Sequence, residues 1–315
     1  MNSLSEIAEI IKKHDNIAIC AHVFPDPDAI GSSCGLERGL AKLGKKVSVC
    51  LSEPPIDRMK EFSSASSIVY PKSPSNFDLI ICVDTANKER VDAMPEVDAL
   101  ILNIDHHESN ALWAKYNYID SKSASCSIII AELLALLEVP LDKEIGSLLL
   151  AGLVDDTGSF RFSNTNRKAL ESAAMFIDAG ASTEEVANAL YFTVPERRLR
   201  LQAKGLERLK LYENGTIGLI SITQDILESL EATADDTDGL VDIARSLKGV
   251  LVAVFIREHA GKWKFSLRSK SKDLSVNKVA AEFGGGGHPA AAGCTMEGTL
   301  EEVEDKIIST LIRYL

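Results

Sequence analysis

Carboxylates and imidazoles recur in this sequence where apolar segments end. Each of them closes or follows a run typical of a buried strand or helix, and the set comprises His22, Asp26, Asp28, Asp84, Asp105, His106, His107 and Asp156. Oxygen and imidazole ligands without a thiolate favour hard or borderline divalent ions such as Mn²⁺ and Mg²⁺. The set therefore predicts a metal site, and its surplus of negative ligands suits two ions that would otherwise repel each other.

Two divalent ions about 3.5–4 Å apart form a phosphoryl-transfer site, because they turn water into a nucleophile and offset charge on the phosphoryl oxygens. One carboxylate must bridge the ions, and Asp84 is the candidate because it stands alone in its segment. His107 is the candidate for donating a proton or a hydrogen bond to the leaving oxygen. Asp105 would fix the orientation of an imidazole. We therefore expect His107 and Asp105 to be catalytic.

Each of these residues also has an ordinary structural explanation. A single aspartate at the end of a strand or the start of a helix is more often a cap than a metal ligand. Asp28, for example, would serve as a cap for the helix expected at residues 29–43. The metal interpretation depends on the co-occurrence of several such residues at predicted strand ends, some of them with histidines attached.

The elements that must position these residues alternate along the first part of the chain. Short β-branched runs predict strands at residues 16–21, 46–51, 67–70, 79–84 and 99–105. Helical spacing of apolar residues predicts helices at residues 29–43, 124–137, 143–154, 167–179 and 183–190. This alternation predicts an α/β fold with a doubly wound, mainly parallel sheet. Since ligands bind beyond the carboxyl ends of such strands, the candidate metal ligands should converge there.

The pattern changes after a basic segment at residues 195–210, which we interpret as part of a connector helix spanning 193–212. Longer strands are then expected at 216–221, 249–257 and 262–269, with helices at 238–247 and 300–315 and a glycine-rich loop at 283–288. The sequence thus predicts a larger domain at 1–192 and a smaller mixed α/β domain at 213–315.

Composition restricts the class of protein. A formal net charge of −12 argues against a protein that coats long nucleic acid, because such binding depends on many phosphate contacts to Lys and Arg. No apolar stretch reaches the length of a membrane span, and residues 1–11 are typical of an amphipathic helix rather than a signal peptide, so a cytoplasmic location is expected. The six cysteines lie singly in apolar runs and are expected to be buried thiols.

Several motifs resemble those of one known family. They are the segment from His22 to Ser32, Val83-Asp84, Asp105-His106-His107, the segment from Asp155 to Phe160, and the glycine run Gly284–Gly287 followed by His288. Together they span nearly the whole chain. The sequence resembles the DHH phosphoesterases that carry a DHHA1 domain, of the nanoRNase and pAp-phosphatase type.

The resemblance implies roles for individual residues. One manganese ion would be held by His22, Asp26 and Asp84, and a second by Asp28, Asp84, His106 and Asp156, with Mg²⁺ or Co²⁺ as alternative metals. His107 would lie beside the scissile phosphate. The implied substrate contacts are Arg268, Gly285, Gly286, Gly287, His288 and Arg245. A flexible linker is the alternative explanation of the glycines, but a run that ends in His288-Pro289 and small residues argues against it, whereas a surface helix residue stays an equal alternative for Arg245. The family also implies a homodimer formed through the N-terminal domain.

The expected function is a manganese-dependent phosphodiesterase that removes nucleotides from very short RNA or DNA, or from linear dinucleotides such as pApA, to release mononucleotides. The same site is expected to act on 3′-phosphoadenosine 5′-phosphate (pAp). Three alternatives stay open: an inorganic pyrophosphatase or exopolyphosphatase, a cyclic-dinucleotide phosphodiesterase, and a nucleotide-binding regulator without catalysis. The intact set of metal ligands argues against the regulator.

Overall fold

The structure is a computed structural model that describes residues 1–55, 57–63, 66–69 and 76–315. It divides into two compact units, Met1–Thr193 and Val194–Leu315. Among the described residues, no helix is both long and apolar enough to cross a membrane.

The first unit is built on a six-stranded sheet in which every pairing is parallel. Its strands are β1 (Asn16–Cys20), β2 (Lys46–Cys50), β3 (Ile68–Val69), β4 (Leu79–Val83), β5 (Leu100–Asp105) and β6 (Tyr116–Ile119). The order β3-β2-β1-β4-β5-β6 is that of a doubly wound sheet, which confirms the predicted fold class. The chain reverses its direction of winding between β1 and β4, so the crevice for a ligand lies at the carboxyl ends of these two strands.

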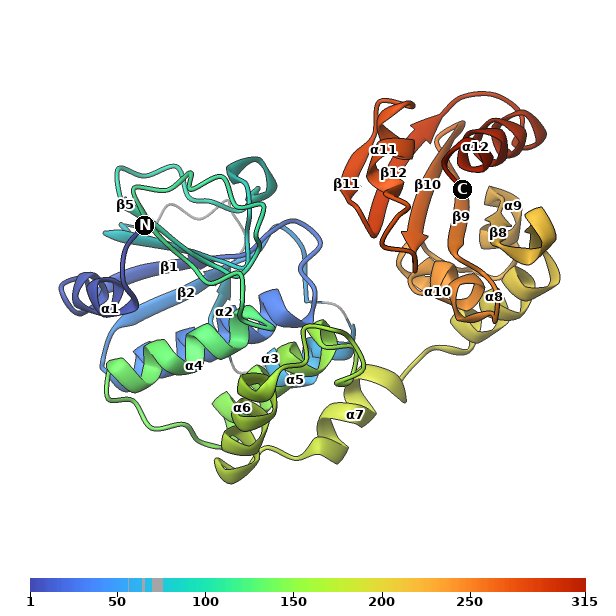
Figure 1. Ribbon diagram of the computed structural model, residues 1–315. Helices are drawn as coiled ribbons and strands as arrows, with labels where there is room; N and C mark the ends of the chain where they lie inside the picture. Colours follow the sequence, from blue (N-terminus) through green and yellow to red (C-terminus); the bar gives the residue numbers. More distant parts are fainter. Residues whose placement is uncertain (56, 64–65, 70–75) are drawn as a thin grey trace. The chain divides into compact units, whose positions relative to one another are not determined.

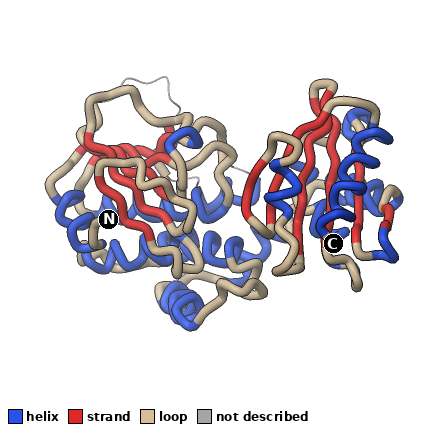
Figure 2. Tube along the Cα trace, turned by 45° about the horizontal axis from the view of Figure 1, so that its top comes forward, coloured by secondary structure: helices blue, strands red, loops and turns tan. Residues whose placement is uncertain are grey.

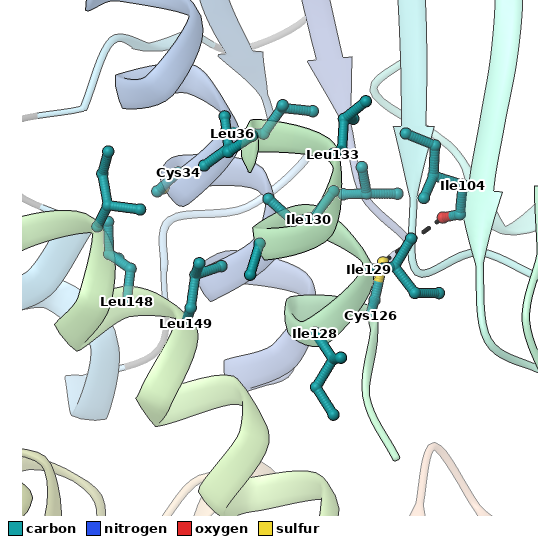
Figure 3. Close-up of a cluster of buried hydrophobic side chains, with 14 of the residues drawn as sticks. Cys34, Leu36, Ile104, Cys126, Ile128, Ile129, Ile130, Leu133, Leu148 and Leu149 are labelled. Carbon is teal, nitrogen blue, oxygen red and sulfur yellow. Dashed lines mark hydrogen bonds between the residues drawn. The ribbon is translucent and has the colours of Figure 1, made fainter. Parts of the chain in front are cut away.

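Helices pack on one face of this sheet, as Figures 1 and 2 show. They are α1 (Leu4–Lys12), α2 (Pro27–Lys42), α3 (Lys60–Ser63), α4 (Cys126–Leu136), α5 (Lys143–Asp156), α6 (Arg167–Asp178) and α7 (Thr183–Tyr191), and the 3₁₀ turns are η1 (Asp57–Met59) and η2 (Lys88–Arg90). Figure 3 shows the core beneath the strands, where α4 lies between β5 and the helices α2 and α5. Cys126 donates its thiol to the carbonyl of Ile104 at 3.6 Å, and all six cysteines are buried free thiols as predicted.

The opposite face of the sheet is covered by the connections between β4, β5 and β6. Val91, Ala93 and Trp113 from these connections pack on the buried side chains of the strands, among them Cys20 and Cys82. Strand β6 was not predicted. Its four residues, Tyr-Asn-Tyr-Ile, include an asparagine, which is depleted in strands. The strand predicted at 67–70 is present as β3, but its last residue lies outside the described part of the chain.

Two glycines let α2 and α5 approach closely. A Cβ atom on Gly31 would lie 2.4 Å from the carbonyl oxygen of Leu148, and one on Gly152 would lie 2.5 Å from Oδ1 of Asp28. Any larger residue at either position would push the helices apart. This close packing brings the start of α2 next to the end of α5.

The second unit holds a mixed sheet in the order β11-β12-β10-β9-β8-β7 (Figure 1). Its strands are β7 (Lys210–Tyr212), β8 (Ile217–Ile222), β9 (Val252–His259), β10 (Lys262–Ser269), β11 (Gly286–His288) and β12 (Ala291–Met296). Its helices are α8 (Glu196–Glu207), α9 (Gln224–Ser229), α10 (Leu240–Ser246), α11 (Val276–Ala281) and α12 (Leu300–Tyr314), with the 3₁₀ turns η3 (Glu213–Gly215) and η4 (Asp235–Thr237). Only β8 and β9 pair in parallel, and the other pairings are antiparallel.

Two segments differ from their expected description. The basic helix interpreted as a connector is α8, and it packs on the second sheet because Leu201 is buried beside Ile220 and Leu240. The glycine-rich segment was expected to be a loop, but Gly286–His288 forms the edge strand β11, paired with β12. The glycines suit this strand, since a Cβ on Gly285 would lie 2.2 Å from the carbonyl oxygen of Gly293.

Candidate metal centre

The candidate ligands of the first unit lie at the carboxyl ends of β1, β4 and β5 and at the facing helix ends. His22 follows β1, Asp84 follows β4 directly, and Asp105 is the last residue of β5, with His106 next in the chain. Asp156 is the last residue of α5. Three overlapping groups of side-chain donors result, each with its ligand atoms within 4.8 Å of one another: His22, Asp26 and Asp84; Asp28, His106 and Asp156; and Asp84, Asp105, His106 and His107.

Asp84 lies between two histidines. Its Oδ1 is 3.3 Å from Nε2 of His106, and its Oδ2 is 3.7 Å from Nε2 of His22. The backbone at Asp84 is in the left-handed region with φ of 53°, which costs a non-glycine residue on the order of 1 kcal/mol. The carboxylate is buried, and its Oδ1 has no hydrogen-bond partner among the described residues. Asp84 is thus placed to offer each of its oxygens to a different cation.

In the group around His22, both His22 and Asp26 use one side-chain atom in a structural hydrogen bond and keep another available as a metal ligand. Nδ1 of His22 donates to the carbonyl of Val23 at 2.8 Å, a hydrogen bond that leaves Nε2 as the free ligand atom. Asp26 is the N-cap of α2, and its Oδ1 accepts the N–H groups of Asp28 and Ala29. Its Oδ2 instead faces Nε2 of His22 at 3.7 Å. Asp26 therefore caps α2 with one oxygen and keeps the other available as a ligand.

The group around His106 is held by the start of α4. Asp28 was expected to cap its own helix, but Asp26 has that role, and the carboxylate of Asp28 accepts the N–H groups of Cys126 at 2.6 Å and Ser127 at 3.0 Å. Nε2 of His106 lies 4.0 Å from Asp28 and 3.2 Å from Oδ2 of Asp156. That oxygen of Asp156 is buried and has no hydrogen-bond partner among the described residues.

The electrostatics of the cluster reflect its excess of carboxylates. Burial lowers the pKa of His22, but the hydrogen bonds and charges of Asp26 and Asp84 outweigh it and raise the pKa to about 10. Burial also lowers the pKa of His106, but Asp84 and Asp28 outweigh this effect and raise that pKa to about 9. Burial and the negative charge of Asp28 and Asp84 raise the pKa of Asp156. Without a cation, the carboxylates are thus balanced by protons.

His107 is oriented by a separate network. Its Nδ1 donates to Oδ1 of Asp105 at 2.7 Å, and burial lowers its pKa less than Asp105 raises it. The other oxygen of Asp105 accepts Nδ2 of Asn110 at 2.6 Å. Asn110 also donates to the carbonyl of Thr85 at 3.1 Å, and this carbonyl accepts Asn103 and Trp113 as well. The residue after Asp84 is therefore tied to the network that holds Asp105.

Two residues of this site were not identified from the sequence. Asn110 follows Asp105 by five positions, a spacing that suggested no ligand, although an amide near the histidine pair is a detectable signal. Arg90 is exposed, and its Nη2 lies 3.3 Å from Nδ1 of His22. Since Nδ1 already donates to Val23, the guanidinium of Arg90 is available to an anion. Arg90 follows Asp84 by six positions with Lys88 between them, so nothing in the sequence distinguishes it from its neighbouring cation.

Two of the substrate contacts implied in the second unit share one face of its sheet. Arg268 on β10 and His288 on β11 both pair in register with Ala291 of β12, so they flank this small residue. Burial lowers the pKa of Arg268, the charge of Asp242 raises it, and the charge of Arg245 lowers it, which places Arg245 near this row. The glycines Gly285, Gly286 and Gly287 lead into the row and allow the tight pairing of β11 with β12.

Comparison with known proteins agrees with this architecture. The family model for the DHH family, N-terminal domain, matches residues 16–153, and the model for the DHHA1 domain matches residues 220–315. A bifunctional oligoribonuclease and PAP phosphatase NrnA of Thermus thermophilus is 31% identical over 312 residues, which cover 97% of this chain and 92% of the relative. The chain belongs to the DHH family. The resemblance noted in the sequence is thereby confirmed.

A second relative and two solved structures extend the comparison. The bifunctional oligoribonuclease and PAP phosphatase NrnA of Bacillus subtilis is 31% identical, with 98% of this chain and 97% of the relative covered. A crystal structure of an exopolyphosphatase-related protein from Bacteroides fragilis superposes with a TM-score of 0.91 at 28% identity, covering 99% of this chain and 96% of that one. The manganese complex of RecJ from Thermus thermophilus has a TM-score of 0.62 at 17% identity and shares the fold.

The residues present fit divalent cations. Two buried carboxylate oxygens, Oδ1 of Asp84 and Oδ2 of Asp156, have no hydrogen-bond partner in the described part of the chain, and both face Nε2 of His106. Buried carboxylate oxygens in native proteins are normally hydrogen-bonded or bound to metal. The donor set contains oxygen and nitrogen but no thiolate, which favours Mn²⁺ or Mg²⁺ over softer ions.

Proposed function

We propose that this protein is a manganese-dependent phosphodiesterase that hydrolyses short oligonucleotides and linear dinucleotides to mononucleotides and also dephosphorylates pAp. The observation that carries the proposal is the position of Asp84, whose two oxygens face His22 and His106 separately. The relatives named as bifunctional oligoribonuclease and PAP phosphatase support the substrate class.

In this proposal, His22, Asp26 and Asp84 hold one ion, and Asp28, Asp84, His106 and Asp156 hold the other. Bound divalent ions would supply Lewis acidity that lowers the pKa of a water and offsets charge on the phosphoryl oxygens. The carboxylate of Asp105 accepts a hydrogen bond from Nδ1 of His107, so Nε2 of His107 points away from Asp105. His107 is half-buried, so this Nε2 can give a proton to the leaving oxygen.

The roles of the two units form part of the same proposal. Residues 1–192 would carry the metal ions and the reacting groups, and residues 213–315 would bind the substrate through Arg268, Arg245, His288 and the glycines Gly285–Gly287. We further propose that the protein acts in the cytoplasm as a homodimer formed through the first unit. Analytical ultracentrifugation of the full chain tests the dimer, and a monomer at micromolar concentration would contradict it.

The function is tested by incubating the manganese-loaded protein separately with pApA, a five-nucleotide RNA, cyclic di-AMP, pAp and pyrophosphate. The control is Asp84→Asn, which keeps the size of the side chain but removes its charge. We expect AMP from pApA and pAp and mononucleotides from the RNA, all absent in the control. Phosphate from pyrophosphate alone would assign the protein to the pyrophosphatases, and substrate binding without any product would indicate a regulator.

A further inference from the structure

One half of a face of the second sheet is left uncovered by the helices of that unit. Along β10, Trp263, Phe265 and Leu267 are buried in the core formed with α11 and α12. The alternate residues point to the other face, where α10 packs on β8 and β9. Over β10, β12 and β11 this face is exposed or half-exposed. The residues on it are Lys262, Lys264, Ser266, Arg268, Ala291, Gly293, Thr295, Gly286 and His288. We call these residues the open face.

A pair of like charges adjoins the open face. Lys264 of β10 lies directly opposite Arg257 of β9 in the antiparallel register, and Arg257 follows Phe255 on the same side of its strand. Among the residues that the structure describes, neither Arg257 nor Lys264 forms an ion pair with a carboxylate. Lys262 differs, because it points to the same face but pairs with Glu297 at 2.7 Å. Like charges directly opposite each other destabilise a sheet, so the Arg257–Lys264 pair indicates an anionic ligand.

The pair is separate from the row of Arg268 and His288. Lys264 and Arg268 are four residues apart on one strand and on the same face, which corresponds to about 13 Å at the usual rise per residue. With both side chains standing roughly perpendicular to the sheet, one phosphate does not contact both positions. A chain of phosphates can, because it presents one negative charge per nucleotide along a strand.

The floor of the open face does not select bases. Between the cations lie the small residues Ala291 and Gly293, and no Phe, Tyr or Trp side chain belongs to the open face as defined above. Proteins that hold single-stranded nucleic acid by its bases place aromatic side chains for stacking. The open face therefore suits a phosphodiester backbone, with little preference among bases.

We propose that Arg257 and Lys264 bind the backbone phosphates of single-stranded oligonucleotides longer than a dinucleotide. This inference takes its substrate class, short oligonucleotides, from the proposed function. It adds two residues that distinguish longer oligonucleotides from dinucleotides. A dinucleotide held at the row of Arg268 and His288 would not reach the pair, whereas a longer strand would. The pair thus raises affinity for oligonucleotides without contributing to dinucleotide turnover.

The test measures binding of a fluorescent seven-nucleotide oligouridylate to the full chain in EDTA, at several salt concentrations, so that no hydrolysis occurs. We expect the double variant Arg257→Ala/Lys264→Ala to bind about tenfold more weakly. For this variant, the slope of log Kd against the logarithm of the salt concentration should fall by about 1.4. Each lost phosphate contact to a single strand lowers the slope by about 0.7. Lys262→Ala is the matched control and should leave both quantities unchanged. An oligoadenylate of the same length should bind within about threefold of the oligouridylate, because stacking is absent.

Turnover by the manganese-loaded protein separates this inference from the proposed function. The double variant should keep the wild-type rate on pApA and lose about tenfold in kcat/KM on the seven-nucleotide RNA. Equal losses on both substrates, or unchanged binding and salt dependence, would overturn the inference. Wild-type protein that binds the oligonucleotide through this pair but hydrolyses nothing would instead contradict the proposed function. Thermal melting of each variant checks that the substitutions, at exposed Lys264 and Lys262 and at half-buried Arg257, leave the fold intact.

Discussion

The carboxylate of Asp28, in the first turn of α2, accepts the backbone N–H of Cys126 at 2.6 Å, although the two residues lie 98 positions apart. Cys126 begins α4, whose own N-cap residue, Ser125, makes no side-chain capping bond. Asp28 therefore caps a second helix while it faces His106 at 4.0 Å. One buried carboxylate joins the helix packing of the first unit to the candidate metal centre.

Substitution of Asp28 should separate these two roles. Asp28→Asn keeps an acceptor for α4 and should cost less stability than Asp28→Ala, for which we expect a loss of about 1–2 kcal/mol. Both variants should bind one manganese ion per chain instead of two, as measured by equilibrium dialysis with elemental analysis. Asp142→Ala, which removes the N-cap of α5, is the control for Asp28→Ala and should lower stability with two ions retained. Two ions bound to Asp28→Ala would show that Asp28 is not a ligand.

Asp105→Asn should lower kcat with little change in KM. The amide cannot accept from His107 with the strength of a carboxylate, so the imidazole loses its fixed orientation and kcat should fall about 10–100-fold. Asn110→Ala removes the group that holds Asp105 and should cause a smaller fall in the same parameter. The rise in melting temperature on adding Mn²⁺ should persist in both. A change in KM alone would contradict an orienting role.

Arg90→Ala should weaken binding of phosphate-bearing substrates. Its guanidinium is exposed beside His22, and a charge-assisted hydrogen bond contributes about 1.5–3 kcal/mol, so KM for pAp should rise at least about tenfold. Metal binding should be unaffected, because the carbonyl of Val23 still orients His22. Lys88→Ala, at another exposed position of η2, provides the comparison. If Arg90→Ala and Lys88→Ala behave alike, Arg90 has no specific contact with substrate.

Glu37→Gln should stabilise the first unit at neutral pH. Glu37 is buried in α2, its Oε2 has no partner among the described residues, and burial raises its pKa above 4.5. An acid whose pKa is raised in the folded state contributes stability below its unfolded pKa and loses it as the pH rises through the folded pKa. Glu37→Gln should therefore gain on the order of 1 kcal/mol over wild type at pH 7 and nothing near pH 4.

Chemical denaturation at the two pH values measures this difference. Glu53→Gln, an exposed position in the same unit, is the control and should show no such dependence on pH. A gain for Glu37→Gln that is equal at both pH values would mean that packing, and not the buried charge, is responsible.

The sequence by itself determined the fold class and which residue types gather at strand ends. Alternating β-branched and helical patterns are local properties, so they identified five of the six strands of the parallel sheet. The rule that ligands bind at the carboxyl ends of such strands then indicated where His22, Asp84 and His106 would lie. Strands β6, β7, β11 and β12 were not predicted. Strands β6, β7 and β11 are only three or four residues long, and β11 and β12 are rich in glycine and alanine, which are depleted in strands.

Only the tertiary structure decided how each carboxylate is used. No spacing in the sequence shows that Asp28 caps α4, that the two oxygens of Asp84 face different histidines, or that Asn110 holds Asp105. The contact of Asp28 with α4 depends on the close packing of α2 and α5 at Gly31 and Gly152, whereas the pairing of β4 with β1 and β5 brings Asp84 to its two histidines. Likewise, Arg257 and Lys264 are ordinary surface cations in the sequence, and only the register of β9 with β10 places them side by side. Residue types and local periodicity set the elements, whereas close packing and strand register set the chemistry between them.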